Sequence, residues 1–128
     1  MTSFAPLAQL VGRILIALIF IVAGWEKVAG YAGTQAYMES QGVPGAALPL
    51  VILLELGGGI AIIAGFMARI VAPLLAGFCI LSALLFHLDF SDQTQMIMFM
   101  KNLAMAGGFL FLFASGAGPY SIDGRRGA

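Results

Sequence analysis

Five ionisable side chains lie inside or at the ends of strongly apolar segments of this sequence. Glu55 is the most isolated, within the run VILLELGGGIAIIAGF at residues 51–66, and Lys101 lies in a second apolar run. The other three end such runs: Glu26, Lys27 and His87. A carboxylate in apolar surroundings requires a positive partner, a proton or water. An acid, a base and an imidazole at one depth can bind a small polar head group or relay protons.

The composition places these side chains in a membrane protein. Of 128 residues, 61% are hydrophobic and 9% are charged, and the mean hydropathy is +1.01. A soluble domain of this size could not cover so much apolar surface, whereas lipid is itself an apolar solvent. The net charge of zero excludes a basic nucleic-acid surface. The single cysteine, Cys79, excludes an intramolecular disulfide and a cysteine metal cluster.

The hydropathy pattern predicts an all-α integral membrane four-helix bundle with up-down topology, forming a single domain over residues 1–128. A helix needs roughly 20 apolar residues to cross a membrane. Four segments qualify, at residues 7–29, 47–66, 70–88 and 96–114. Residues 35–41 are predicted to form a short helix between the first two spans, capped by Thr34 and ended by Gly42. Nearby tyrosines favour an interfacial position for this helix.

The basic residues predict the orientation of the bundle. One end carries four arginines, which are Arg13, Arg69, Arg125 and Arg126. The other end carries only two lysines, together with most of the acidic residues. Because cytoplasmic loops are enriched in Lys and Arg, we expect the arginine end and both termini to be cytoplasmic.

This topology would bring the ionisable residues into one layer in the outer half of the bundle. Glu55 would lie ~12 Å deep and Lys101 ~8 Å deep. In a structural interpretation, Glu55 and Lys101 form a buried ion pair, and a network completes it with Asn102, Glu26 and Lys27. In a functional interpretation, the same side chains line a ligand pocket, with Trp25 beside it and His87 at its rim. Both interpretations stay open from the residues alone.

The arginine end offers a second candidate pair. Arg13 lies about a turn and a half inside the first span, and the C-terminal tail carries Asp123. If the tail folds back, Asp123 can pair with Arg13 and hold the C-terminus; otherwise Arg13 extends to the head groups. No metal site is predicted, since His87 is the single histidine and has only Asp89 and Asp92 nearby. The sequence contains no phosphate-binding loop, HExxH or nucleophile elbow.

An ordered set of short motifs resembles the DoxX family and covers essentially the whole chain. The motifs are Gly12-Arg13, Gly24-Trp25-Glu26-Lys27, Gly42-Val43-Pro44, Glu55-Leu56-Gly57-Gly58-Gly59, His87, Lys101-Asn102 and Tyr120-Ser121-Ile122-Asp123. The resemblance implies a four-helix protein of the bacterial inner membrane. It also implies relatives among the small membrane subunits of thiosulfate:quinone oxidoreductase and the partners of secreted oxidative-stress enzymes.

These observations predict an accessory membrane subunit of a redox or oxidative-stress complex, with no catalytic motif of its own. The outer pocket would bind a quinone-like ligand, which is the one candidate cofactor. Alternatively it would receive a membrane or periplasmic redox protein. A homo-oligomer is a separate option for the chain as a whole. Two other functions stay open: a small proton-coupled carrier that uses Glu55, and a purely structural membrane scaffold.

Overall fold

Four helices long and apolar enough to cross a membrane occur in the computed structural model, which describes residues 4–126. Three of them are continuous: α1 (Ala5–Ala29), α5 (Ala68–Phe86) and α6 (Gln93–Ser115). The fourth is the composite second span, Gly45–Ala64. All regular structure in the described range is helical, which confirms the prediction of an all-α membrane protein with four apolar spans.

The second span is not a uniform helix. It begins with a 3₁₀ turn (Gly45–Ala47), continues as α3 (Leu48–Ile52), passes through a π-helical turn (Leu53–Gly57) and ends as α4 (Gly58–Ala64). A π turn is rare, occurs mostly as a single turn within an α-helix, and is frequently found at functional sites. Glu55 lies at the centre of this turn and is buried. The hydropathy pattern, which is insensitive to helix type, gave no sign of it.

A short helix, α2 (Tyr31–Ser40), follows α1 after Gly30 and begins earlier than predicted. Thr34 therefore lies inside the helix, and its hydroxyl donates to the carbonyl of Gly30 at 3.0 Å. This corrects the expectation that Thr34 caps the helix, since a threonine hydroxyl can also bond back to the preceding turn. The ring of Tyr37 stacks on Phe86 of α5 at 5.6 Å between centroids.

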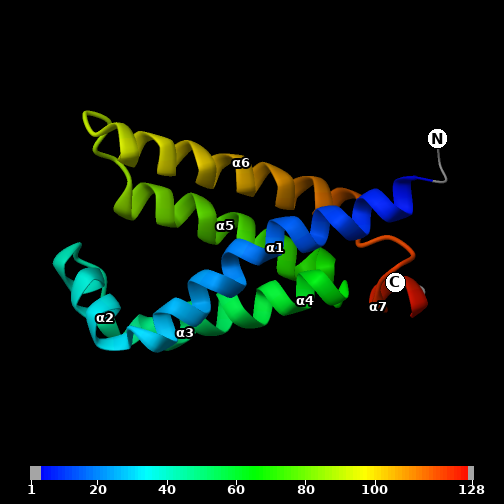
Figure 1. The fold of residues 1–128 in the computed structure, drawn as a ribbon, viewed down its shortest axis with the longest axis horizontal. Helices are drawn as coiled ribbons and strands as arrows, with labels where there is room; N and C mark the ends of the chain where they lie inside the picture. Colours follow the sequence, from blue (N-terminus) through cyan, green and yellow to red (C-terminus); the bar gives the residue numbers. More distant parts are fainter. Residues whose placement is uncertain (1–3, 127–128) are drawn as a thin grey trace.

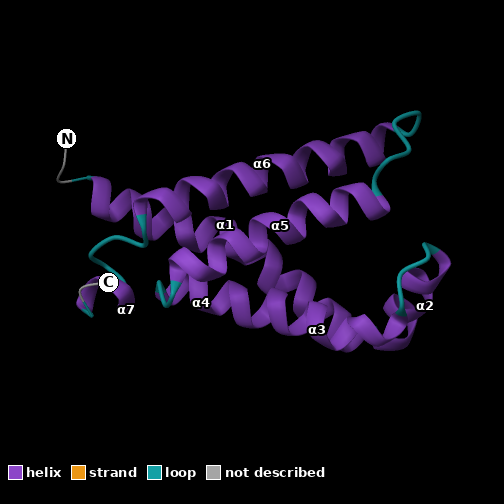
Figure 2. Ribbon diagram, turned by 180° about the vertical axis from the view of Figure 1, so that it is seen from behind, coloured by secondary structure: helices purple, strands orange, loops and turns teal. Residues whose placement is uncertain are grey.

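The helices form two hairpins that meet in one core. Figure 1 shows α1 beside α3 and α4, and α5 beside α6; Figure 2 shows the same pairing from behind. In both views the hairpins diverge towards α2, and the N- and C-terminal segments lie at the opposite end. Phe20 of α1 meets Phe109 of α6 edge to face at 5.4 Å. The buried core is apolar and small-residue-rich: Ala17, Phe20, Ile62, Ala72, Leu75, Ala76, Cys79, Ala106 and Phe109.

Two glycines allow α1 to approach the second span closely. A Cβ atom on Gly24 would lie 2.7 Å from Cγ of Leu56, and one on Gly59 would lie 2.8 Å from Cγ1 of Ile21. Both distances are below normal contact, so a larger residue would separate the helices. Small residues at such interfaces matter because lipid supplies no hydrophobic drive for association between membrane helices.

The contact at Gly24 predicts a stability difference between two alanine substitutions on α1. Gly24→Ala should lower the stability in detergent by about 1 to 3 kcal/mol, since the added methyl group overlaps Leu56. Gly12 is exposed and has nothing within 4 Å of its Cβ position. Gly12→Ala should therefore leave the stability unchanged or raise it slightly. Thermal unfolding followed by circular dichroism measures both, and equal effects would contradict the packing described.

Candidate functional site

A buried ion pair joins the end of α1 to the π turn. Nζ of Lys27 lies 2.9 Å from Oε1 of Glu55. The Glu55 side chain is 5% exposed, whereas that of Lys27 is 27% exposed. This is the one salt bridge among residues 4–126. The carboxylate is thus enclosed by protein, and its positive partner remains accessible from outside the bundle.

Lys101, the predicted partner of Glu55, lies elsewhere. It is exposed on α6, in a shallow groove with an apolar lining formed by Met96, Ile97, Met100 and Ala104. The residues that α6 buries are Ala106 and Phe109. Counting residues from the helix start predicts the depth of a side chain, but packing decides the rotation of the helix about its axis. The predicted Glu55–Lys101 pair is therefore replaced by a pair with Lys27.

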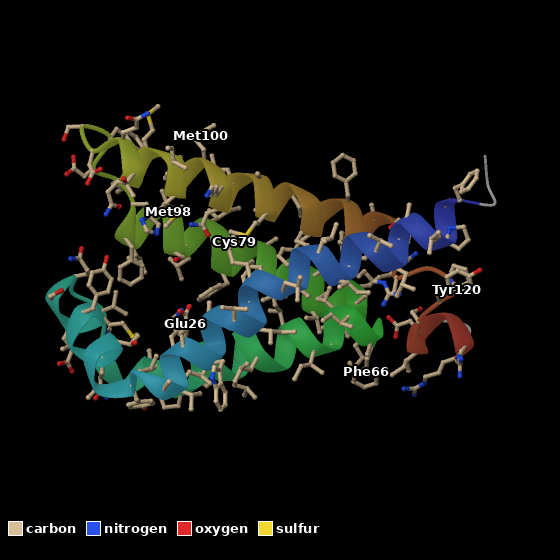
Figure 3. The ribbon with its side chains drawn as sticks, in the orientation of Figure 1. Glu26, Phe66, Cys79, Met98, Met100 and Tyr120 are labelled. Carbon is tan, nitrogen blue, oxygen red and sulfur yellow. The ribbon has the colours of Figure 1, made fainter. Side chains whose placement is uncertain are left out.

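The remaining predicted site residues do not join this ion pair. Asn102 donates its side-chain amide to the carbonyl of Met98 on its own helix, at 3.1 Å. Nδ1 of His87 lies 2.8 Å from Oε1 of Gln95, which links the end of α5 to the start of α6. Trp25 is 64% exposed. Glu26 is exposed as well, on the part of α1 where the hairpins diverge (Figure 3).

At the opposite end of α1, Arg13 is almost fully buried, with 2% of its surface exposed. Its guanidinium donates to the carbonyl oxygens of Ile62 at 3.2 Å and Ile63 at 2.8 Å, and also to that of Tyr120. The last carbonyls of a helix have no partner within it. A cation at this end also interacts favourably with the negative end of the helix dipole. Arg13 therefore caps the C-terminal end of α4.

Asp123 caps the other side of the same connection. Its two carboxylate oxygens each accept a backbone N–H at 2.8 Å, from Met67 and Ala68 at the start of α5. Its own backbone N–H donates to the carbonyl of Gly65 at 2.9 Å. Gly65 has a φ of +69°, and a Cβ there would lie 2.5 Å from Nη1 of Arg13. The tail thus closes over the turn between α4 and α5.

The predicted Arg13–Asp123 ion pair is not among the contacts of the described residues. Both side chains lie at this turn, but each one binds backbone groups. The reason is that a helix that ends and a helix that begins leave unpaired carbonyls and N–H groups next to each other. No cluster of three or more potential metal ligands occurs among the described residues.

Comparison with known proteins identifies several relatives. The DoxX family model matches residues 8–88. Inner membrane protein YqjF of Escherichia coli (strain K12) is 55% identical over 123 residues, which cover 96% of this chain and 95% of that protein. Inner membrane protein YphA of the same strain is 37% identical over 128 residues, covering 94% and 91%. The "Putative oxidoreductase CatD" of Bacillus subtilis (strain 168) is 33% identical over 76 residues, covering 59% and 57%. No solved structure matches the chain.

The two lysines should differ sharply when either is replaced. Lys27→Met leaves Glu55 buried without its partner and should cost about 3 kcal/mol of stability. Lys101→Met removes an exposed charge and should change the stability by less than about 0.5 kcal/mol. The double variant Lys27→Met/Glu55→Met should recover most of the loss, because no buried charge remains. Chemical unfolding in mixed micelles measures all three, and a larger cost for Lys101→Met would argue for the partner expected from sequence.

Replacement of Asp123 tests the cap on α5. Asp123→Ala should lower the stability by about 1 to 2 kcal/mol, because two backbone N–H groups lose their acceptor. Asp123→Asn keeps one acceptor oxygen and should lose less. Asp89→Ala, in the exposed loop before α6, serves as the control. Limited proteolysis of the C-terminal segment should show faster cleavage in the order alanine, asparagine, wild type; equal rates would mean that the carboxylate does not hold the tail.

Proposed function

The chain belongs to the DoxX family and is a multi-pass inner-membrane protein, and from this starting point we propose that it is an accessory membrane subunit of a redox or oxidative-stress complex. The observation that supports the proposal best is the Lys27–Glu55 pair at 2.9 Å, with a buried carboxylate and an accessible ammonium. Ionisable groups within membrane spans usually face the protein interior and mark functional positions.

The ammonium of Lys27 has the donors that a quinone-like head group requires. It carries three N–H donors, and Glu55 occupies one direction around it. The other donors can reach the oxygens of a quinone or of its reduced form, while the enclosed carboxylate orients the ammonium. Lys27 would therefore bind both redox forms, and the apolar tail of such a ligand would stay in lipid.

The surroundings of the pair support a ligand that enters from the membrane. Lys27 lies three residues from Gly30 at the end of α1, on the side where the hairpins diverge (Figures 1 and 2). The π turn holds Glu55 against it from the second span. Helix packing and the turn fix the two groups before any ligand arrives, which lowers the entropy cost of binding.

The exposed face of α6 supports the second part of this proposal, which is the binding of a partner protein. Lys101 lies in a groove of about 510 Å³ whose other lining residues are Met96, Ile97, Met100 and Ala104. An exposed cation in an otherwise apolar groove can pair with a carboxylate from a neighbouring membrane helix. CatD carries the word oxidoreductase in its name, which favours a redox partner over other kinds. A second copy of this chain is the other occupant to test.

The arrangement along α1 supports binding over proton-coupled transport. A carrier that used Glu55 would need polar groups between the two ends of the bundle. The buried face of α1 between Arg13 and Lys27 consists of Ala17, Phe20 and Gly24. These side chains offer neither a donor nor an acceptor. A scaffold without a ligand would retain the same ion pair, so only an experiment separates it from a binding subunit.

Co-purification separates these functions. Wild-type protein extracted in mild detergent should carry a quinone detectable by mass spectrometry. Glu55→Gln and Lys27→Gln should reduce the amount about tenfold, since each removes a charge-assisted hydrogen bond. Lys101→Gln should retain the quinone and lose any partner protein recovered with the wild type. If the wild-type protein carries neither a quinone nor a partner protein, the structural scaffold is the remaining function.

A further inference from the structure

The arginine end of the molecule has many more positive than negative side chains. Five of the six acidic residues belong to the half that contains α2, namely Glu26, Glu39, Glu55, Asp89 and Asp92. The sixth, Asp123, uses both carboxylate oxygens on the backbone of α5. Three exposed arginines remain at this end: Arg69, Arg125 and Arg126. None of them forms a salt bridge within residues 4–126.

A pocket of about 330 Å³ opens beside the short helix α7 (Ile122–Arg125) at this end. Its lining combines apolar and polar side chains: Ala64, Pro119, Tyr120, Ser121, Ile122 and Arg125. The hydroxyl of Ser121 already donates to the carbonyl of Gly118 and accepts from the N–H of Gly124. Arg125 and the phenol of Tyr120 are therefore the groups left to receive a ligand, and a guanidinium favours a phosphate.

The walls of this pocket are fixed by the backbone contacts of the tail. Arg13 donates to the carbonyl of Tyr120, and Asp123 is joined to Gly65, Met67 and Ala68. These contacts hold the segment without using Arg125 or Arg126. A ligand would thus meet a preformed site, which reduces the ordering cost of binding.

Apolar side chains around the pocket favour a lipid over a soluble anion. Tyr120 is 57% exposed, Ile122 41% and Phe66 38%. Figure 3 shows Tyr120 and Phe66 on two sides of α7, at the end where the spans finish. The guanidinium of Arg126 lies over the Phe66 ring, 6.0 Å from its centroid. A pocket lined by one arginine, with a second arginine next to it in the chain and exposed apolar side chains nearby, matches a phosphate head group with its acyl chains attached.

We propose that this pocket binds the phosphate of an anionic phospholipid, with Arg125 as the main contact and Arg126 as the second. The lipid supplies the negative charge that the arginine end lacks.

The test uses full-length protein in nanodiscs, and its probes are phosphatidylglycerol and phosphatidylcholine. Native mass spectrometry should show retained phosphatidylglycerol and little phosphatidylcholine. Arg125→Gln should weaken retention about fivefold, and Arg125→Gln/Arg126→Gln about 25-fold, as expected for one surface cation each. Arg69→Gln removes the same charge at the same end of the molecule but outside the pocket, and should have no effect.

Three results would overturn the proposal. Equal retention of the two lipids would show that the negative charge is not recognised. An equal loss in Arg69→Gln would show that the effect depends on net charge alone. Displacement of phosphatidylglycerol by millimolar inorganic phosphate would show a site for free anions. Thermal unfolding of Arg125→Gln without added lipid should match wild type, so that a loss of lipid reports on the pocket itself.

Discussion

Two cations on one face of the first helix join it to the second span, and the remaining structure depends on this connection. Arg13, Ala17, Phe20, Gly24 and Lys27 succeed one another at intervals of four and three residues, which places them along one stripe of α1. The stripe has a guanidinium on helix carbonyls at one end, an ammonium on a carboxylate at the other, and apolar contacts between. Groups at membrane depth must find partners within the protein. These two cations therefore determine which helices are neighbours and in which register.

The spans could be predicted from sequence because lipid makes length and hydropathy decisive. The expected segments differ from the observed helices by only a few residues. Partners within the candidate site could not be predicted in the same way. Lys27 and Lys101 are both compatible with the depth of Glu55, and the choice between them depends on the rotation of α6, which Ala106 and Phe109 decide by packing. Asp123 was expected near Arg13, but the unpaired N–H groups of α5 become visible only when the tight turn at Gly65 is known.

The two ends of the molecule differ in chemistry as well as in charge. The end with α2 has a buried acid beside an accessible base, in a region where the hairpins diverge. The arginine end is closed by backbone caps, with Arg13 buried in one of them and Arg69, Arg125 and Arg126 exposed. Such a division suits a protein in which one end receives a ligand or partner and the other holds the bundle in the bilayer. Close helix contacts at Gly24 and Gly59 connect the two ends.

The π turn in the second span has a geometric consequence for the helix that follows it. Each residue advances an α-helix by about 100°, and a π turn contains one residue more per hydrogen-bonded loop than an α turn. Everything after Gly57 is therefore rotated relative to α3 by that phase difference. Removing a single residue here would return the segment to an ordinary α-helix. This deletion would rotate one part of the span relative to the other, so that either Gly59 no longer faces Ile21 or Glu55 no longer faces Lys27. The irregular turn thus acts as a phase adjustment that lets a close-packed glycine and a buried charge both face the same neighbouring helix.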